Sequence, residues 1–509
     1  MKNSASEKII SALHANWWLN LGGLLLSYLA SVALVRAVAR ELFAQYSAVL
    51  AIIAVATFIF EAGANSGLTR YLREASDNRA TGTFYLRMQR RRWLAALICA
   101  VAVVLLGPIY ARSTQLGAAA AQPWVFICVA IIVAATLTKL LAHYGLLALF
   151  ESRTALFIQQ GFLALRAATL ATIALLGGGL AELVGTLVVI SVVEALLVHR
   201  KFWRLIHRDR EPVSTGFVNA AQKFGLLTVF DKAAAMLGSG SVILLVLAPR
   251  HPATTIALLA LAVDLVGKVV SLTVMPMGNL VAPYLSHTSD EPAVQGRAVA
   301  RVLKLSCLLY AFTIGAALLL FPWFIGFVYG ARYEGAVGLT LLLLVPTAIE
   351  NWIRGCCSPA LLRNGRASSL MKLNVLQAVA TLAMLAFVRH ESIEVVVLSV
   401  LSVRAAIASL NLVLLRGLLP AGSYRVPMQA VLIGASSYAL ASLWGSLLPL
   451  DNAARAAVEA VSYAVLFYAG LRWLVLRDRD TLHLAHRITG RQPRLLAWVL
   501  PPPAPLLNT

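Results

Sequence analysis

The sequence predicts an all-α, polytopic membrane protein of about 14 transmembrane helices, in two six-helix pseudo-symmetric lobes plus two extra helices. Three observations predict this fold class. Apolar stretches of about twenty residues recur along nearly the whole chain, and that is the length a helix needs to cross a bilayer core about 30 Å thick. Lys and Arg gather in alternate gaps between the stretches, and the second half of the chain repeats short motifs of the first.

Composition agrees with a chain that lies mostly in lipid. Hydrophobic residues make up 60% of it and charged residues 13%, with a mean hydropathy of +0.80. A helix is the simplest way to satisfy every backbone N–H and C=O in hydrocarbon. The net charge of +21 would indicate nucleic acid in a soluble protein, but here most of it belongs to loops at the membrane surface. We therefore expect the lipid bilayer, and no nucleic acid, as a partner.

The hydrophobic stretches define the expected elements in order. Residues 1–15 form an amphipathic N-terminal segment, 16–199 the first lobe, 200–219 a linker, 220–416 the second lobe, 427–476 the last two spans and 477–509 a basic, proline-rich tail. The spans are expected near 16–35, 44–64, 93–110, 122–142, 155–176, 180–199, 220–247, 253–282, 302–328, 335–353, 368–388, 393–415, 427–448 and 456–476.

Loop charges predict the orientation of the chain. Most basic residues fall on one side of the membrane, in the N-terminus, the 66–92 segment, the 200–216 gap and the tail. The opposite gaps hold only Arg36, Arg40, Arg112, Arg250, Arg332, Arg389 and Arg455. The positive-inside rule then places both termini in the cytoplasm. On this interpretation the run Arg90–Arg92 is a topology signal, with lipid headgroup contact as the alternative.

An internal repeat relates the two halves. Tyr71-Leu72 after the second span corresponds to Tyr284-Leu285 after the eighth, 213 positions later, and Asp77 corresponds to Asp290. Tyr110-Ala111-Arg112 has a counterpart in Tyr329-Gly330-Ala331-Arg332. Because each half holds an even number of spans, the repeats enter from the same side and are related by an axis along the membrane normal. Such halves place a binding site between them, near the midplane.

Several of these segments carry a family likeness. They are Arg40-Glu41-Leu42-Phe43-Ala44-Gln45-Tyr46-Ser47, Glu61-Ala62-Gly63, Thr69-Arg70-Tyr71, Lys223-Phe224-Gly225-Leu226-Leu227, Tyr329 to Ala336, and Arg363-Asn364-Gly365-Arg366. Over roughly residues 1–420 the chain resembles the polysaccharide (Wzx-type) flippases of the multidrug/oligosaccharidyl-lipid/polysaccharide exporter superfamily. The resemblance implies two lobes around a central cavity and transfer of undecaprenyl-diphosphate-linked oligosaccharide across the bacterial cytoplasmic (inner) membrane. A polysaccharide polymerase and a chain-length regulator are the further partners it implies.

Ionisable residues inside the spans are the candidate site, because a charge at bilayer depth needs a partner or a water-filled cavity. A diphosphate cargo calls for fixed cations, and Arg offers a planar fork to phosphate oxygens. The diphosphate candidates are Arg166, Arg404, Lys139, Lys232 and Lys268; Arg166 and Arg404 are preferred because they lie deepest. The sugar-contact candidates are Asn65, Gln159, Asn374 and Gln377, and the coupling-ion candidates are Asp231, Asp264 and Glu350.

Several of these residues also have a purely structural interpretation. Asp264 and Lys268 are four apart on one helix face, as are Glu350 and Arg354, so each pair can neutralise itself. The amides can serve ordinary interhelical packing. The five cysteines show no disulfide or metal-site spacing, so no metal or cofactor is expected.

The sequence predicts a transporter and not an enzyme. It contains no nucleotide-binding Gly-rich loop, no His-Glu-x-x-His and no loop long enough for a catalytic domain. Two transporters of the same superfamily are alternatives: a lipid II flippase, and a cation-coupled multidrug exporter, whose cavity would be dominated by carboxylates such as Asp231 and Asp264. A membrane glycosyltransferase or polymerase is the alternative of another class, and it predicts a large periplasmic loop.

Overall fold

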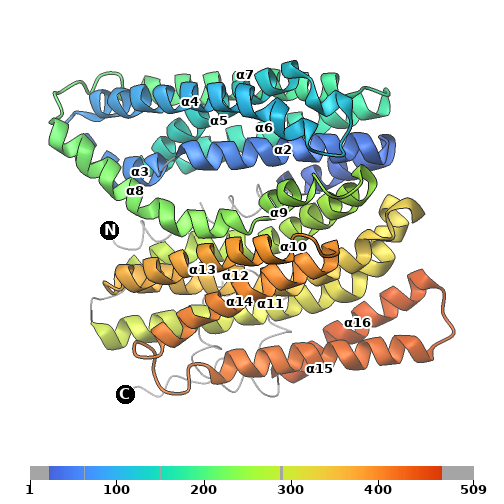
Figure 1. Cartoon of the computed structure of the whole chain (residues 1–509). Helices are drawn as coiled ribbons and strands as arrows, with labels where there is room; N and C mark the ends of the chain where they lie inside the picture. Colours follow the sequence, from blue (N-terminus) through green and yellow to red (C-terminus); the bar gives the residue numbers. More distant parts are fainter. Residues whose placement is uncertain (1–21, 24, 62, 150, 287–290, 473–509) are drawn as a thin grey trace. The chain divides into compact units, whose positions relative to one another are not determined.

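The structure is a computed structural model that describes residues 22–472 apart from 24, 62, 150 and 287–290. All regular elements in these residues are helices (Figure 1). The first is the short apolar helix Leu25–Ala37. Thereafter come α2 (Arg40–Glu61), α3 (Ala64–Asp77), α4 (Thr81–Arg112), η1 (Ala118–Ala121), α5 (Pro123–Ala148), α6 (Ser152–Leu175), α7 (Leu180–Ile206), α8 (Thr215–Leu237), α9 (Gly240–Leu247), α10 (Ala253–Ser286), α11 (Pro292–Tyr329), η2 (Ala331–Tyr333), α12 (Ala336–Arg363), α13 (Ala367–Val388), α14 (Ile393–Leu415), α15 (Arg425–Leu447) and α16 (Asn452–Gly470).

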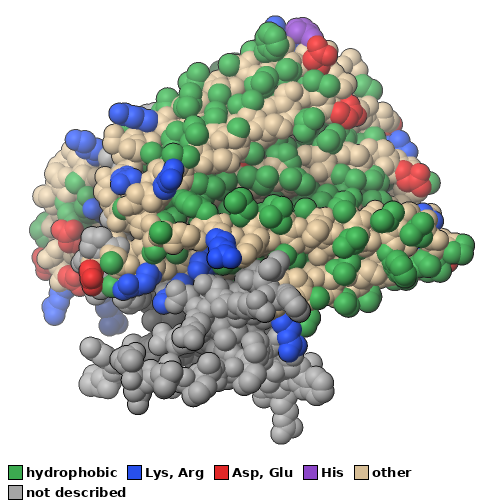
Figure 2. All heavy atoms as spheres, turned by 90° about the horizontal axis from the view of Figure 1, so that it is seen from below, with side chains coloured by type: hydrophobic (Ala, Val, Ile, Leu, Met, Phe, Trp, Pro, Cys, Tyr) green, Lys and Arg blue, Asp and Glu red, His purple; other side chains and the backbone are tan. Residues whose placement is uncertain are grey.

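The predicted fold class is confirmed. Within the described residues, eleven helices are long and apolar enough to cross a membrane, so the protein is a multi-pass membrane protein. Every expected span from 44–64 to 456–476 overlaps a helix. Large apolar side chains such as Phe157, Leu175 and Phe387 remain exposed, and Figure 2 shows hydrophobic side chains spread over the face it displays. These eleven helices do not fix the predicted total of about 14. The predicted segments 1–15 and 477–509 lie outside the described residues.

The expected span 220–247 is corrected to two helices. The chain leaves α8 at Gly238, and α9 begins after Ser239, whose hydroxyl accepts a hydrogen bond from the backbone N–H of Val242 at 3.4 Å. Serine is a favoured helix N-cap because its oxygen satisfies one of the unpaired amides of the first turn. The Gly238-Ser239-Gly240 sequence thus ends one helix and starts the next.

The expected span 93–110 is the apolar part of a longer helix. α4 begins at Thr81, so the arginines from Arg87 to Arg92 lie on a helix and not in a loop. Hydropathy detects only the segment that matches the bilayer, whereas the helix continues past it. As a result, the helix geometry of α4 determines which neighbouring helix each of these arginine side chains faces.

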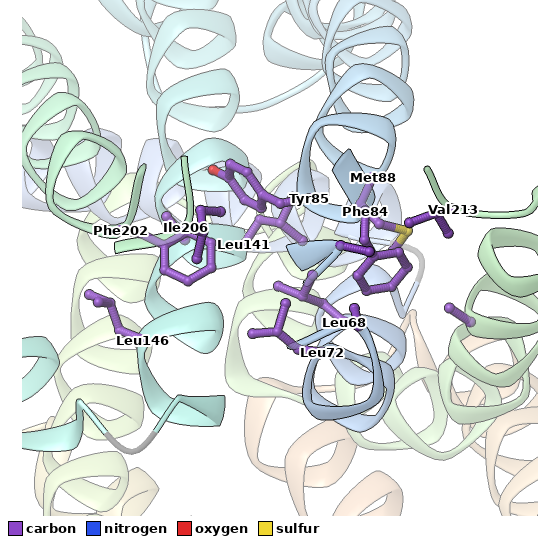
Figure 3. Packing of buried hydrophobic residues seen from close by; sticks show 14 of the residues in the cluster. Leu68, Leu72, Phe84, Tyr85, Met88, Leu141, Leu146, Phe202, Ile206 and Val213 are labelled. Atoms are coloured by element: carbon purple, nitrogen blue, oxygen red, sulfur yellow. The ribbon is translucent and has the colours of Figure 1, made fainter. Parts of the chain in front are cut away.

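The described residues form two compact units. Unit 1 comprises those of Met1–Asp264 and Asn374–Val400, and unit 2 comprises the rest. Unit 1 extends through the expected linker at 200–219, and the two-lobe division at that linker stays a prediction. In unit 1, α5 packs against α4 and α7. Figure 3 shows part of the core in this unit, where Leu68 and Leu72 of α3 lie near Phe84 of α4, and Leu141 of α5 lies near Phe202 of α7.

A backbone-to-backbone contact joins α3 and α8 within unit 1. Gly63 has φ +69°, a left-handed conformation that glycine adopts without steric cost, and it ends the turn between α2 and α3. A methyl group on Gly63 would overlap the carbonyl group of Gly225, and one on Gly225 would lie 2.6 Å from the Gly63 oxygen. Glycine at both positions therefore permits this crossing.

In unit 2, the long helix α11 packs against α12, α15 and α16. Figure 1 shows α15 and α16 side by side. The Tyr463 hydroxyl on α16 donates to the backbone oxygen of Ala311 on α11 at 2.8 Å. Arg366, at the start of α13, donates to the carbonyl oxygen of Leu414 on α14 at 2.5 Å. These bonds anchor helix backbones to one another in addition to the apolar packing.

Candidate functional site

Two cations share one buried carboxylate in unit 1. Glu194 on α7 accepts from Lys139 Nζ on α5 at 3.1 Å and from Arg166 Nη2 on α6 at 3.3 Å, both at Oε2. We call these three residues the Glu194 cluster. The Glu194 side chain is 4% exposed, whereas those of Lys139 and Arg166 are 20% and 33% exposed. With all three groups charged, the cluster has one positive charge in excess.

Arg166 has hydrogen-bonding capacity that its protein partners do not use. Its Nε is buried and has no hydrogen-bond partner within the described part of the chain. A buried donor without an acceptor costs about 1–3 kcal/mol. An anion that accepted from Nε and Nη2 together would satisfy this donor and neutralise the excess charge. Arg166 is therefore the strongest phosphate-binding candidate among the expected residues.

The preferred cation of unit 2 has a closed geometry. Arg404 on α14 donates from Nε to Glu350 Oε2 at 3.0 Å and from Nη2 to Oε1 at 2.5 Å. The Arg404 and Glu350 side chains are only 3% and 8% exposed. The expected pair within α12 also forms, but it is longer, with 3.6 Å between Arg354 Nε and Glu350 Oε1. Two donors of the Arg404 guanidinium are already bound to Glu350. Arg404 is therefore a weaker candidate than Arg166 for binding phosphate.

The other expected ionisable residues are placed as follows. Asp264 on α10 accepts a hydrogen bond at Oδ2 from the hydroxyl of Ser31 at 2.8 Å. Lys268 lies one turn further along α10 and is half-buried. Asp231 and Lys232 lie on α8, but their side chains are outside the described part of the structure.

The expected sugar-contact amides fall into different environments. Asn65 on α3 is 1% exposed, and its Oδ1 accepts from Arg92 Nη2 at 2.7 Å. Gln159 on α6 is exposed. Asn374 and Gln377 are buried one turn apart on α13. Burial of the last two fits the packing interpretation as well as a sugar-facing one.

Arg92 is a structural residue that the sequence interpretation missed. It was expected to mark topology, yet it is buried and donates to the backbone oxygens of Glu61 and Leu137, at 2.7 and 3.2 Å, in addition to Asn65. Glu61 is the last residue of α2 and Asn65 belongs to the first turn of α3. Arg92 thus joins the ends of both helices at their break. Residue type and spacing did not distinguish Arg92 from its neighbours Arg90 and Arg91.

The described residues offer no obvious metal site. No three His, Cys, Asp or Glu side chains among them lie close enough together to hold a metal ion. The cysteines within them are free, and Cys356 lies 3.0 Å from the hydroxyl of Ser306 in a buried contact.

Comparison with known proteins identifies a family and a fold. A family model described as polysaccharide biosynthesis protein matches residues 15–289. No curated protein matches the chain in sequence. Among solved structures, the lipid II flippase MurJ in an inward closed conformation is similar with a TM-score of 0.70 at 12% identity, over 91% of this chain and 99% of that one.

More distant structures share the same fold. A point variant of the Vibrio cholerae MATE transporter VcmN has a TM-score of 0.54 at 11% identity, over 83% of this chain and 100% of that one. A MOP superfamily transporter from Pyrococcus furiosus has a TM-score of 0.51 at 14% identity, over 84% of this chain and 95% of that one. At these identities the likeness concerns the fold.

Proposed function

Because the chain belongs to the polysaccharide biosynthesis protein family, we propose that it flips undecaprenyl-diphosphate-linked oligosaccharide from the cytoplasmic to the outer leaflet of the bacterial inner membrane. The products would supply O-antigen, exopolysaccharide or capsule synthesis. The protein would work by alternating access, with its binding site open to one side of the membrane at a time, and would not itself hydrolyse nucleotide. A polymerase and a chain-length regulator would act on the transferred units.

The observation that supports this proposal most directly is the Glu194 cluster. Its excess positive charge and the unsatisfied Nε of Arg166 fit a phosphate group. A charged diphosphate crosses hydrocarbon only if cations replace its hydration. Lys139 and Arg166 are the bound-state partners we propose, with Glu194 holding both cations in place when no substrate is bound.

The chain's charges also weigh against a multidrug exporter that moves organic cations. Such an exporter needs carboxylates that face its cargo, whereas Glu194 and Glu350 are each occupied by more than one cation. Asp264, which accepts from Ser31, remains a candidate for coupling-ion binding. A lipid II flippase remains the second candidate, and one observation favours it: MurJ resembles this chain over almost its whole length.

A leaflet assay tests the proposed function. We expect deletion of the gene to leave lipid-linked repeat units on the cytoplasmic leaflet and to remove surface polymer, while peptidoglycan synthesis continues. The assay measures periplasmic accessibility of the lipid-linked sugars to an added glycosidase. Normal surface polymer in a deletion strain without a paralogue would contradict the proposal, and arrested peptidoglycan synthesis would support the lipid II alternative.

A further inference from the structure

A groove with two chemically distinct ends lies between α6 and α7 in unit 1. Its cavity volume is about 450 Å³. One end is formed by three exposed cations in the last two turns of α7, Arg200, Lys201 and Arg204. The remainder is apolar and runs along Leu197 of α7 and several residues of α6, including Phe157, Phe162 and Leu165. None of the groove-lining residues carries a carboxylate, an amide or a hydroxyl.

The place of the groove in the fold matches the edge of a bilayer leaflet. The cations belong to the end of α7 that the loop charges assign to the cytoplasmic side, and the start of α6 lies beside them. Phe157 is 70% exposed and Leu165 48%, so the apolar wall is open to the acyl chains. A basic pocket between membrane helices on the cytoplasmic side is suited to an anionic lipid headgroup.

We propose that this groove binds an anionic phospholipid of the cytoplasmic leaflet. The phosphodiester lies against Arg200, Lys201 and Arg204, and one acyl chain follows the apolar wall past Gly161. Three cations beside an apolar channel complement a phosphate on a hydrocarbon chain, whereas the lining has no polar uncharged group to recognise a sugar. For this reason we assign the groove to a phospholipid and not to the oligosaccharide-linked substrate. Its lining shares no residue with the Glu194 cluster.

Charge variants with a matched control test the headgroup end. The triple variant Arg200→Gln/Lys201→Gln/Arg204→Gln removes the groove cations. Arg90→Gln/Lys223→Gln/Arg208→Gln removes two arginines and one lysine that are also exposed but do not line the groove. Native mass spectrometry of the purified full-length protein then measures retained phosphatidylglycerol. We expect the groove variant to retain at least about tenfold less phosphatidylglycerol than the wild type, and the control variant to retain as much as the wild type.

A second pair of variants tests the apolar end without changing charge. A Cβ on Gly161 meets no atom within 4 Å, so a side chain can start there, and Gly161→Leu is the variant chosen to occupy the groove. Gly185→Leu is the control, because that glycine on α7 has the same open surroundings outside the groove lining. We expect only Gly161→Leu to lower phosphatidylglycerol retention, with the melting temperature of both variants unchanged.

Three results would overturn the proposal. The first is equal phosphatidylglycerol retention by the groove variants and their controls. The second is equal retention of zwitterionic phosphatidylcholine and phosphatidylglycerol by the wild type. The third is loss of added polyprenyl diphosphate from the groove variants while phosphatidylglycerol stays bound, which would assign the groove to the substrate carrier.

Discussion

Arg404 and Glu350 form a two-point ion pair, with Nε donating to Oε2 at 3.0 Å and Nη2 to Oε1 at 2.5 Å. Lys139 and Glu194 form the corresponding long-range ion pair of unit 1, but the order of the two charges along the chain is reversed. On α5 and α7 the cation comes first, whereas on α12 and α14 the carboxylate does. The unit 1 pair also holds the partly exposed Arg166, which gives the two clusters different expected behaviour on substitution.

We predict that Arg404→Met lowers stability more than transport. The change removes both short contacts of the buried Glu350 carboxylate with the Arg404 guanidinium, and removal of one partner of a buried ion pair costs about 3–5 kcal/mol. The melting temperature of the detergent-solubilised protein should fall, and Glu350→Met in the same chain should recover much of it. Arg425→Met, at an exposed arginine, is the control. A variant with unchanged melting temperature and no surface polymer would instead make Arg404 a substrate ligand.

Arg166 should show the opposite pattern. We predict that Arg166→Ala abolishes surface polymer while the amount of folded protein stays near the wild-type level, because Lys139 still pairs with Glu194. Arg166→Lys should restore transport only in part, since an ammonium lacks the planar fork. Surface polymer and membrane protein are quantified in the same cultures, with Arg112→Ala at an exposed position as the control. Loss of the protein itself would assign Arg166 a structural role.

The Glu194 carboxylate should be needed for folding. We predict that Glu194→Gln lowers the yield of folded protein several-fold, because it removes the negative charge of the carboxylate that both Lys139 and Arg166 contact. Lys139→Gln added to this variant should raise the yield again by removing one of the two cations. Size-exclusion chromatography of a fluorescent fusion measures both, and a wild-type yield for Glu194→Gln would contradict the prediction.

The α3–α8 crossing gives a test that involves no charge. We predict that Gly225→Ala destabilises the protein by about 1–3 kcal/mol, since the added methyl would lie 2.6 Å from the Gly63 oxygen. Gly161→Ala adds the same methyl where no atom lies within 4 Å, so it should be neutral. The melting temperatures of the two variants provide the comparison. Equal values would show that the helices separate at little cost.

Topology can be checked independently of function. We predict that single cysteines at positions 79 and 208, in a background without the native cysteines, resist a membrane-impermeant thiol reagent in intact cells, whereas one at position 390 reacts. The native residues at all three positions are exposed, so a failure to react reports the side of the membrane and not burial. Lysed cells supply the accessibility control. The reverse labelling pattern would invert the proposed orientation.

The sequence predicted what local hydropathy and charge can encode. The expected span 393–415 coincides with α14, and 368–388 differs from α13 by one residue, because those helices end where their apolar runs end. Hydropathy missed the first turns of α4, since they extend past the bilayer. The expected span 220–247 missed the break at Gly238-Ser239-Gly240, where the Ser239 cap starts a new helix, because the apolar stretch continues across it.

Long-range partners were beyond such an interpretation. Glu350 and Arg354, four residues apart, were expected to pair, but the shorter contacts come from Arg404 on another helix. Arg92 was interpreted together with Arg90 and Arg91 as one basic run that marks topology. In the structure Arg90 and Arg91 are exposed, whereas the Arg92 side chain points inward and donates to Asn65. Residue type and depth in the membrane identify candidate site residues. Which residue each one pairs with depends on which helices pack against each other.

The separation of the paired charges along the chain bears on how the protein is made. Lys139 precedes Glu194 by 55 residues, and Glu350 precedes Arg404 by 54, so the first charge of each pair leaves the ribosome two spans before its partner. A lone charge at the centre of a bilayer costs at least about 2.5–3.5 kcal/mol on insertion scales. Release of α5 or α12 into lipid alone would incur that cost. Helices α5 to α7, and likewise α12 to α14, are therefore expected to wait beside the translocon and enter the membrane as triplets.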